Sequence, residues 1–306
     1  MATPHGPRRG SLQFWPRVRA KRIYPKVSFW SGDGIQGFAG YKVGMVQYSA
    51  IETRKNVNQG KEIVRAATVL EIPVIYPIGI AFYKNNRKIT EYFNIKELPK
   101  DLKKDLKRKI KIKTEEYGKI PEEFDKLRIK VSNFPRKTGL KKTPEIFELG
   151  CKLELDKAKE LIGNELKIGE YFSEGDVIEV TSVTKGKGTQ GTIKRFGCKL
   201  RSHKAKKGRR RVGSIGSVTP RKVDWRVPMP GQMGFHQRTE YNKLILKISD
   251  NLDEINPKQG FKEYGLVKTK YMLIDGSIPG ARKRMILLRK PKKQKKEILQ
   301  VQEILK

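Results

Sequence analysis

Acidic residues are absent from two long parts of this 306-residue chain. None precedes Asp33, and none occurs from Val180 to Val223, a stretch of 44 residues that holds 14 lysines and arginines. The whole chain carries 68 basic against 32 acidic side chains, a formal net charge of +36. Self-repulsion of such a charge destabilises a compact protein unless a polyanion neutralises it. The candidates for that partner are nucleic acid and an anionic membrane surface.

Long apolar runs and cysteines are also scarce. No stretch approaches the roughly 18 consecutive apolar residues of a membrane helix, and the N-terminus lacks the apolar core of a signal peptide. We therefore expect that the chain does not span a membrane, and we expect no membrane partner. Cys151 and Cys198 are too few and too isolated for a disulfide framework or a zinc site, which suits a reducing cytoplasm.

The rest of the sequence has the pattern of a mainly β protein with an α insertion, an α+β fold. Runs rich in β-branched and aromatic residues, bounded by Gly, Pro or Asn, predict strands. These runs are Tyr41–Tyr48, Ile63–Val69, Val74–Tyr83, Asp176–Val183, Thr192–Arg195, Asn242–Ile248, Leu266–Ile274 and Arg284–Leu288. Leucines at helical spacing predict a helix within Glu97–Lys113, and Asp156–Ile162 predicts a short second one. Many short strands with few helices favour a closed β-barrel with an inserted helical subdomain over helices crossing between parallel strands.

The segment 184–239 has the composition of an RNA-binding loop. Its apolar residues are too scattered to fold alone, and its glycines let the backbone approach a partner closely. Arginine binds phosphate through paired hydrogen bonds and stacks on bases. Phe196, Trp225 and Phe235 are available to stack on unpaired bases, or else to anchor the loop to the protein's own barrel. RNA is preferred to DNA because no helix-turn-helix, zinc-finger or basic-zipper pattern is present.

The histidines, cysteines and carboxylates of the sequence do not have the spacing of a catalytic or metal-binding site. His5, His203 and His236 have no metal-ligand spacing with the cysteines, and we expect each to contact RNA or to pack. No G-x-x-x-x-G-K-[ST] loop occurs. Paired carboxylates such as Glu122-Glu123 lie in the electrically balanced middle, whereas a nuclease needs acids that hold metal within its basic cleft. We expect no enzyme, cofactor, metal or small-molecule substrate.

Short motifs in a fixed order carry a resemblance to a known family. They are Arg9–Leu12 (RGSL), Pro16–Ala20 (PRVRA), Gly40–Met45 (GYKVGM), Lys185–Gly191 (KGKGTQG), Gly213–Gly216 (GSIG), Thr219-Pro220, Gly231–Gly234 (GQMG) and Arg238-Thr239. Over nearly its whole length the chain resembles the universal large-subunit ribosomal protein three in its archaeal form. Thr189, Ser217 and Val218 depart from residues common in that family. Different packing is expected at Thr189, at the base of the finger, and mechanisms built on the side chains at positions 217 and 218 are not carried over.

The resemblance implies a β-barrel of the translation-protein type, an N-terminal arm buried in ribosomal RNA, and a finger reaching toward the peptidyl transferase centre. Val212–Arg226 would form the fingertip. It also implies a structural constituent of the large subunit in the cytoplasm, which supports subunit assembly and translation. The implied partners are large-subunit ribosomal RNA near its three-prime end and neighbouring large-subunit proteins.

Composition, periodicity and resemblance together predict seven segments. They are an extended basic arm over 1–32, the first barrel strands over 33–95, an inserted helical subdomain with return strands over 96–175, a barrel strand and finger base over 176–195, the extended basic finger over 196–240, the last barrel strands over 241–290 and a basic tail over 291–306.

The residues predicted to bind RNA are basic, aromatic or amide-bearing side chains of the arm and the finger. They are Arg8, Arg9, Trp15, Arg17, Arg19, Lys21, Arg22, Lys185, Lys187, Lys194, Arg195, Lys199, Arg201, His203, Lys204, Lys206, Lys207, Arg209, Arg210, Arg211, Arg221, Lys222, Trp225, Arg226, Gln232, His236 and Arg238. Two other hypotheses stay open at this point. A general nucleic-acid compaction protein would bind duplex DNA and ribosomal RNA equally, and an RNA-modifying enzyme would turn over an RNA substrate.

Overall fold

The chain forms two compact units, each built from segments that are distant in the sequence. The computed structural model describes residues 8–54, 57–110, 116–206, 208–219, 221–297 and 299–305. Met1–Arg22 and Thr184–Gln237 make up one unit, which we call the basic unit. Ile23–Val183 and Arg238–Lys306 make up the other, which we call the body.

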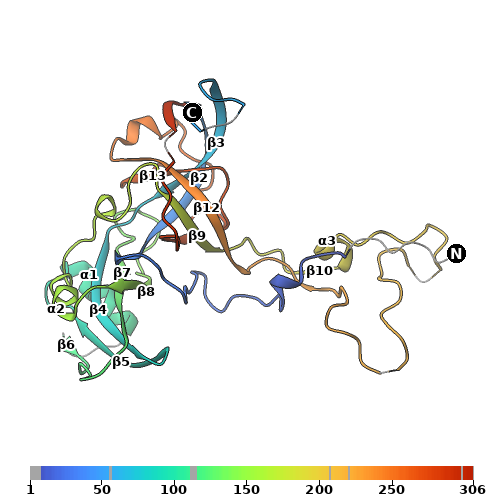
Figure 1. Ribbon diagram of the computed structural model, residues 1–306, viewed down its shortest axis with the longest axis horizontal. Coiled ribbons are helices and arrows are strands. Elements are labelled where there is room, and N and C mark those ends of the chain that lie inside the picture. Colours follow the sequence, from blue (N-terminus) through green and yellow to red (C-terminus); the bar gives the residue numbers. More distant parts are fainter. Residues whose placement is uncertain are drawn as a thin grey trace. The chain divides into compact units, whose positions relative to one another are not determined.

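Most regular structure lies in the body (Figure 1). Its strands are β1 (Gly34–Ile35), β2 (Gly37–Ile51), β3 (Glu62–Glu71), β4 (Ile75–Lys84), β5 (Arg87–Asn94), β6 (Glu116–Tyr117), β7 (Lys126–Asn133), β8 (Ile146–Lys152), β9 (Val177–Val183), β12 (Gln237–Ser249), β13 (Tyr271–Asp275), β14 (Met285–Arg289) and β15 (Gln300–Leu305). Its helices are α1 (Lys100–Ile110), α2 (Leu155–Glu160) and the 3-10 turns η2 (Ile168–Glu170) and η3 (Leu252–Glu254). The prediction of a mainly β, α+β chain is confirmed.

The larger sheet of the body returns to its starting strand. Its order is β14-β9-β12-β13-β3-β2-β15, and β14 pairs with β2 as well as with β9. Leu287 of β14 lies opposite Thr181 of β9 on one side and Ala39 of β2 on the other. Six strands thus form a hydrogen-bonded ring, and β15 adds to the far end of β2, where Gln300 pairs with Ile51.

A second sheet of the body has the order β1-β8-β7-β4-β5-β6. Helix α1 presents Leu102 and Leu106, one turn apart, to Phe93 and Tyr76 of this sheet, and all four side chains are buried together. The predicted interval 96–175 therefore contains both expected helices together with strands β6 to β8. Residues 111–113 of the predicted first helix lie outside the described residues.

One core joins the two sheets. Strand alternation places Tyr41 and Tyr271 of the larger sheet and Ile129 and Phe147 of the second sheet in the same buried cluster. Burying each large side chain contributes roughly 1.5–3 kcal/mol relative to exposure. The body therefore has an ordinary apolar core.

Two sequence predictions need correction. Thr192–Arg195 was expected to be a strand, but Thr192–Phe196 is a helix, α3. The glycines that flank it, Gly191 as its N-cap and Gly197 with a left-handed φ of 68° as its C-cap, outweigh the β-branched Thr and Ile. The predicted strand Leu266–Ile274 begins only at Tyr271, because the preceding backbone bonds to a buried side chain.

That side chain is Glu71, a fully buried carboxylate at the end of β3. Its Oε1 accepts hydrogen bonds from the backbone N–H groups of Lys268 at 2.8 Å and Thr269 at 2.9 Å. Its other oxygen accepts one from the hydroxyl of Tyr264. Burial, and next the charge of Glu71, raise the pKa of Tyr264, so the phenol keeps its proton and donates it.

Replacing Tyr264 with Phe should lower the free energy of unfolding by about 1–2 kcal/mol, because Glu71 loses one of its buried donors. Chemical denaturation of the two proteins measures the difference. Tyr241→Phe is the matched control, since Tyr241 is 59 % exposed and its substitution should change little. Equal losses in the two variants would contradict a stabilising role for this hydrogen bond.

Candidate nucleic-acid interface

Positive charge is concentrated in the basic unit. This unit holds 21 of the 68 lysines and arginines but only one of the 32 acidic residues, Asp224. The carboxylate of Asp224 accepts a hydrogen bond from the backbone N–H of Arg226 at 2.7 Å. More than half of the net charge of +36 therefore belongs to residues 1–22 and 184–237.

A short two-stranded stem organises the long loop. Strand β10 (Thr189–Gln190) pairs antiparallel with β11 (Gly231–Gln232). The ladder is extended by bonds from Lys187 N–H to the Met233 carbonyl and from Met233 N–H to the Gly188 carbonyl, both 2.9 Å. Between the end of α3 and β11, the described residues contain no helix or strand. The stem thus holds the two ends of an irregular basic loop together.

Helix α3 is tied to the returning side of the loop by Arg195. Its guanidinium donates to the carbonyls of Gln232 at 3.0 Å and Met229 at 2.8 Å. Residues more than 30 positions apart are therefore linked by one side chain. Arg195 fixes the helix on the stem and is half-buried there.

The N-terminal arm packs on this same framework. Trp15 stacks on Phe196 of α3 with ring centroids 5.6 Å apart and planes 20° from parallel. The guanidinium of Arg17 lies 4.3 Å from the centre of the Phe196 ring and donates to the Arg195 carbonyl at 3.3 Å. Trp225 meets Trp15 edge-on at 5.7 Å. Aromatic stacks and cation–π contacts each contribute roughly 0.5–2 kcal/mol.

Further along, the arm is bound to the stem by two hydrogen bonds. The backbone N–H of Ala20 donates to the Phe235 carbonyl at 2.8 Å. The Nδ1–H of His236 donates to the Val18 carbonyl at 2.7 Å. Arg19 lies over the Phe235 ring at 5.1 Å. Arm and stem therefore form one structural unit although they are more than 160 residues apart in the chain.

The cations of this unit repel one another. Burial, and next the charge of Arg8, lower the pKa of Arg17. Burial, and next the charge of Arg17, lower the pKa of Arg195. Each guanidinium remains charged at neutral pH, because arginine keeps its proton in proteins. Like charges held close together without acids favour an anionic partner.

Most of the predicted RNA-binding side chains are exposed. The exposed set is Arg8, Arg9, Arg19, Lys21, Arg22, Lys185, Lys187, Lys194, Lys199, Arg201, His203, Lys204, Lys206, Arg209, Arg210, Arg211, Arg221, Lys222, Trp225 and Arg226. The half-buried set is Trp15, Arg17, Arg195, Gln232 and Arg238, the last of which belongs to the body. Lys207 and His5 lie outside the described residues.

The buried or internally packed members have a scaffold role in this structure. His236 is only 8 % exposed and bonds to the arm, which is the packing alternative allowed for it by the sequence. Phe196 is 6 % exposed and packs on the arm, whereas the sequence alternatives were RNA bases or the barrel. Trp225 remains 56 % exposed. Sequence reasoning missed the pairing of arm with stem, for which no local pattern exists.

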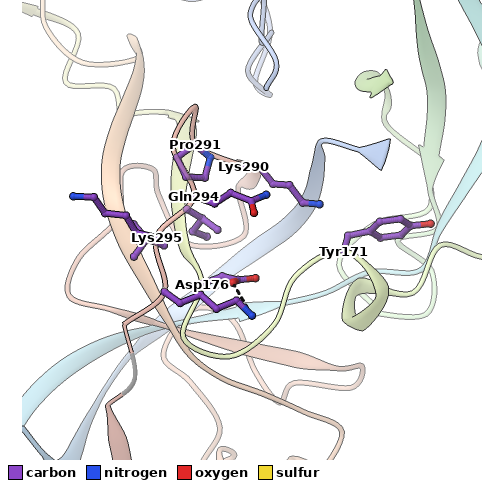
Figure 2. Close-up of a pocket in the computed structure, with 9 residues that line it drawn as sticks. Tyr171, Asp176, Lys290, Pro291, Gln294 and Lys295 are labelled. Atoms are coloured by element: carbon purple, nitrogen blue, oxygen red, sulfur yellow. Dashed lines mark ion pairs between the residues drawn. The ribbon is translucent and has the colours of Figure 1, made fainter. Parts of the chain in front are cut away.

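Two hollows differ in how their charges are balanced. One in the basic unit, of about 370 Å³, is lined by Arg17, Lys185, Lys187 and Arg195 without an acidic residue. One in the body, of about 170 Å³, is shown in Figure 2. It has Asp176 among its lysines, and a dashed line marks the ion pair of 3.8 Å from this carboxylate to Lys296.

Known proteins resemble this chain along its entire sequence. The family model described as "Ribosomal protein L3" matches residues 1–306. The chain belongs to the ribosomal protein L3 family. It is 44 % identical over 316 residues to the large ribosomal subunit protein uL3 of Nanoarchaeum equitans (strain Kin4-M), covering 95 % of this chain and 94 % of that relative.

Other members of the ribosomal protein L3 family are similar over comparable lengths. The uL3 protein of Methanocaldococcus jannaschii is 42 % identical over 318 residues, with 97 % of this chain and 95 % of the relative covered. That of Caldivirga maquilingensis is 41 % identical, with 94 % and 90 % covered. The predicted family is confirmed. Within the part of the chain that the structure describes, no helix is long and apolar enough to cross a membrane.

Proposed function

We propose that the chain is a structural, non-catalytic constituent of the large ribosomal subunit in the cytoplasm. The observation that carries the proposal is the basic unit, in which 21 cationic side chains accompany a single acid. Such a surface gains binding free energy from a polyphosphate by releasing counterions. Family membership supports RNA of the large subunit as that polyphosphate, since the relatives are named large ribosomal subunit protein uL3.

The body would provide the stable fold, and the arm and the long loop would provide most of the RNA contacts. The six-stranded ring of the body is proposed to be a barrel of the translation-protein type, with 96–175 as its insertion. The arm and the loop 196–240 are proposed to enter ribosomal RNA near its three-prime end, and 212–226 to form the tip of a finger reaching toward the peptidyl transferase centre. Neighbouring large-subunit proteins would contact the body, and the complex would support assembly and translation.

Titrating the whole protein with large-subunit ribosomal RNA at several salt concentrations tests the proposal. The logarithm of the association constant should fall by roughly 0.7–0.9 for each phosphate contact per tenfold rise in salt. A steep slope is expected because the basic unit exposes most of its cations. A slope near zero would contradict binding through phosphate.

Duplex DNA of equal charge is the matched competitor in the same titration. A large-subunit component should prefer its RNA, since an irregular basic loop can fit folded RNA and its splayed bases. Equal affinity for the duplex would favour the compaction hypothesis instead. Sedimentation of the endogenous protein with large subunits is the independent check.

A further inference from the structure

The hollow of the basic unit brings together cations from three separate segments. Arg17 comes from the arm, Lys185 and Lys187 from the entering side of the stem, and Arg195 from α3. Its volume of about 370 Å³ leaves room for an anion with ordered waters, since a water occupies roughly 30 Å³ in the liquid. Its walls also include the amide side chain of Gln232.

These cations have donors that the protein does not use. The Nη1 of Arg17 donates to the Arg195 carbonyl, but its Nε is enclosed and meets no acceptor among the described residues. The ammonium groups of Lys185 and Lys187 pair with no carboxylate in the described part of the chain, and both side chains are exposed. Exposed cations that are held close together without a carboxylate attract an anion from the solution.

The hollow of the body provides the contrast. Its Lys296 is opposed by Asp176, whose carboxylate also accepts hydrogen bonds from the N–H and hydroxyl of Ser173 at 2.8 and 3.0 Å. The protein thus supplies a counter-charge in one hollow and none in the other. The hollow of the basic unit therefore has four cationic side chains and no carboxylate in its lining, whereas the lining of the body hollow includes one carboxylate.

We infer that this hollow binds one phosphate group of an RNA backbone, which bridges the arm to the stem. The inference rests on the proposed function and names a specific contact within it. The Nη2 groups of Arg17 and Arg195 bond to no acceptor among the described residues and can donate to phosphate oxygens, and the two lysines provide point charges beside them. A bound phosphate converts the repulsion between Arg17 and Arg195 into joint attraction, so it holds the arm against α3.

Occupancy of the hollow should therefore stabilise the docked arm. The reporter is the amide of Ala20, whose N–H bonds to the Phe235 carbonyl across the arm–stem contact. An anion that binds only when the arm is docked raises protection of this amide by mass action. Docking of the arm on the stem and binding of the phosphate are thus coupled, so each favours the other.

Hydrogen exchange of the whole protein, followed at Ala20 during titration with a five-nucleotide single-stranded RNA, tests the inference. The double variant Lys185→Ala, Lys187→Ala should need roughly 100-fold more RNA for half-maximal protection, about tenfold for each lost charged contact. The pair Lys290→Ala, Lys295→Ala removes equal charge from the body hollow and should leave the midpoint unchanged. Lys185→Arg, Lys187→Arg should retain the response.

Three results would overturn the inference. The first is an unchanged RNA concentration for half-maximal protection in the Lys185→Ala, Lys187→Ala variant. The second is an equal shift of that concentration in the Lys290→Ala, Lys295→Ala variant. The third is no rise in protection of the Ala20 amide in the unaltered protein. Inorganic phosphate serves as a second probe and should protect at higher concentration than the oligonucleotide. Protection by inorganic phosphate alone would assign the hollow to a free anion rather than to RNA.

Failure of this site is distinguishable from failure of the proposed function. If the unaltered protein binds ribosomal RNA with a steep salt slope while the alanine pair behaves normally at Ala20, the hollow is not the contact and the function stands. If the unaltered protein shows no preference for ribosomal RNA over duplex DNA, the proposed function fails whatever happens at Ala20.

Discussion

Replacing Arg209, Arg210 and Arg211 together with Ala should weaken binding to large-subunit RNA by roughly 100-fold at about 0.1 M salt, with the body left intact. Each lost phosphate contact lowers the association constant by a factor of roughly five at that salt concentration. The reason is that each contact contributes about 0.7 to the slope of the logarithm of the association constant against the logarithm of the salt concentration. All three side chains are exposed in the loop beyond α3. The salt slope should fall by roughly two units at the same time.

The matched control removes three cations from the body. Lys100, Lys104 and Arg108 lie exposed along one face of α1, where Ala is well tolerated. Their replacement should change RNA affinity by less than about threefold, since they lie in the balanced middle of the chain. Thermal unfolding should give similar midpoints for both triple variants. Equal affinity losses would mean that net charge, rather than the loop, determines binding.

Replacing Gly234 with Ala should open the stem. Its φ is +70°, and a Cβ there would lie 2.1 Å from the carbonyl oxygen of Lys185. The left-handed backbone and the overlap together should cost about 3 kcal/mol or more. Hydrogen exchange at Lys187 and Met233, whose amides form the ladder, should accelerate by about 100-fold.

Gly213 provides the control in the same loop. A Cβ at that position meets nothing within 4 Å, and its backbone is not left-handed. Gly213→Ala should leave exchange at Lys187 and Met233 unchanged. If Gly234→Ala behaved in the same way, the stem would not depend on the close approach of these two backbone segments.

Strands of the ring were readable from the sequence because their apolar patterns are local. Tyr41–Tyr48 lies within β2 and Ile63–Val69 lies within β3, as predicted. Strand β7 was not predicted as such, although Leu127, Ile129 and Val131 alternate with charged residues and are buried. The region is electrically balanced in composition, and its period of two is the signal that indicates a strand.

The candidate interface likewise has one property that the sequence predicts and one that it does not. Its charge could be predicted, since a run without acids is a property of composition. The docking of Trp15 on Phe196 could not, because it joins two irregular segments that are 181 positions apart and share no periodic pattern. Aromatic residues in a basic loop are compatible with stacking on bases and with stacking on protein, and only geometry separates the two.

The pairing of β14 with β2 has a consequence for synthesis on the translating ribosome. Met285 lies opposite Tyr41, so the seam joins positions 244 residues apart. A nascent chain exposes the unpaired edge of β2 until β14 has left the exit tunnel. Closure is consequently a late event, and non-local pairing of this kind folds slowly and is prone to aggregation. Newly made chains should depend on chaperones until Met285–Arg289 has emerged and can pair with β2.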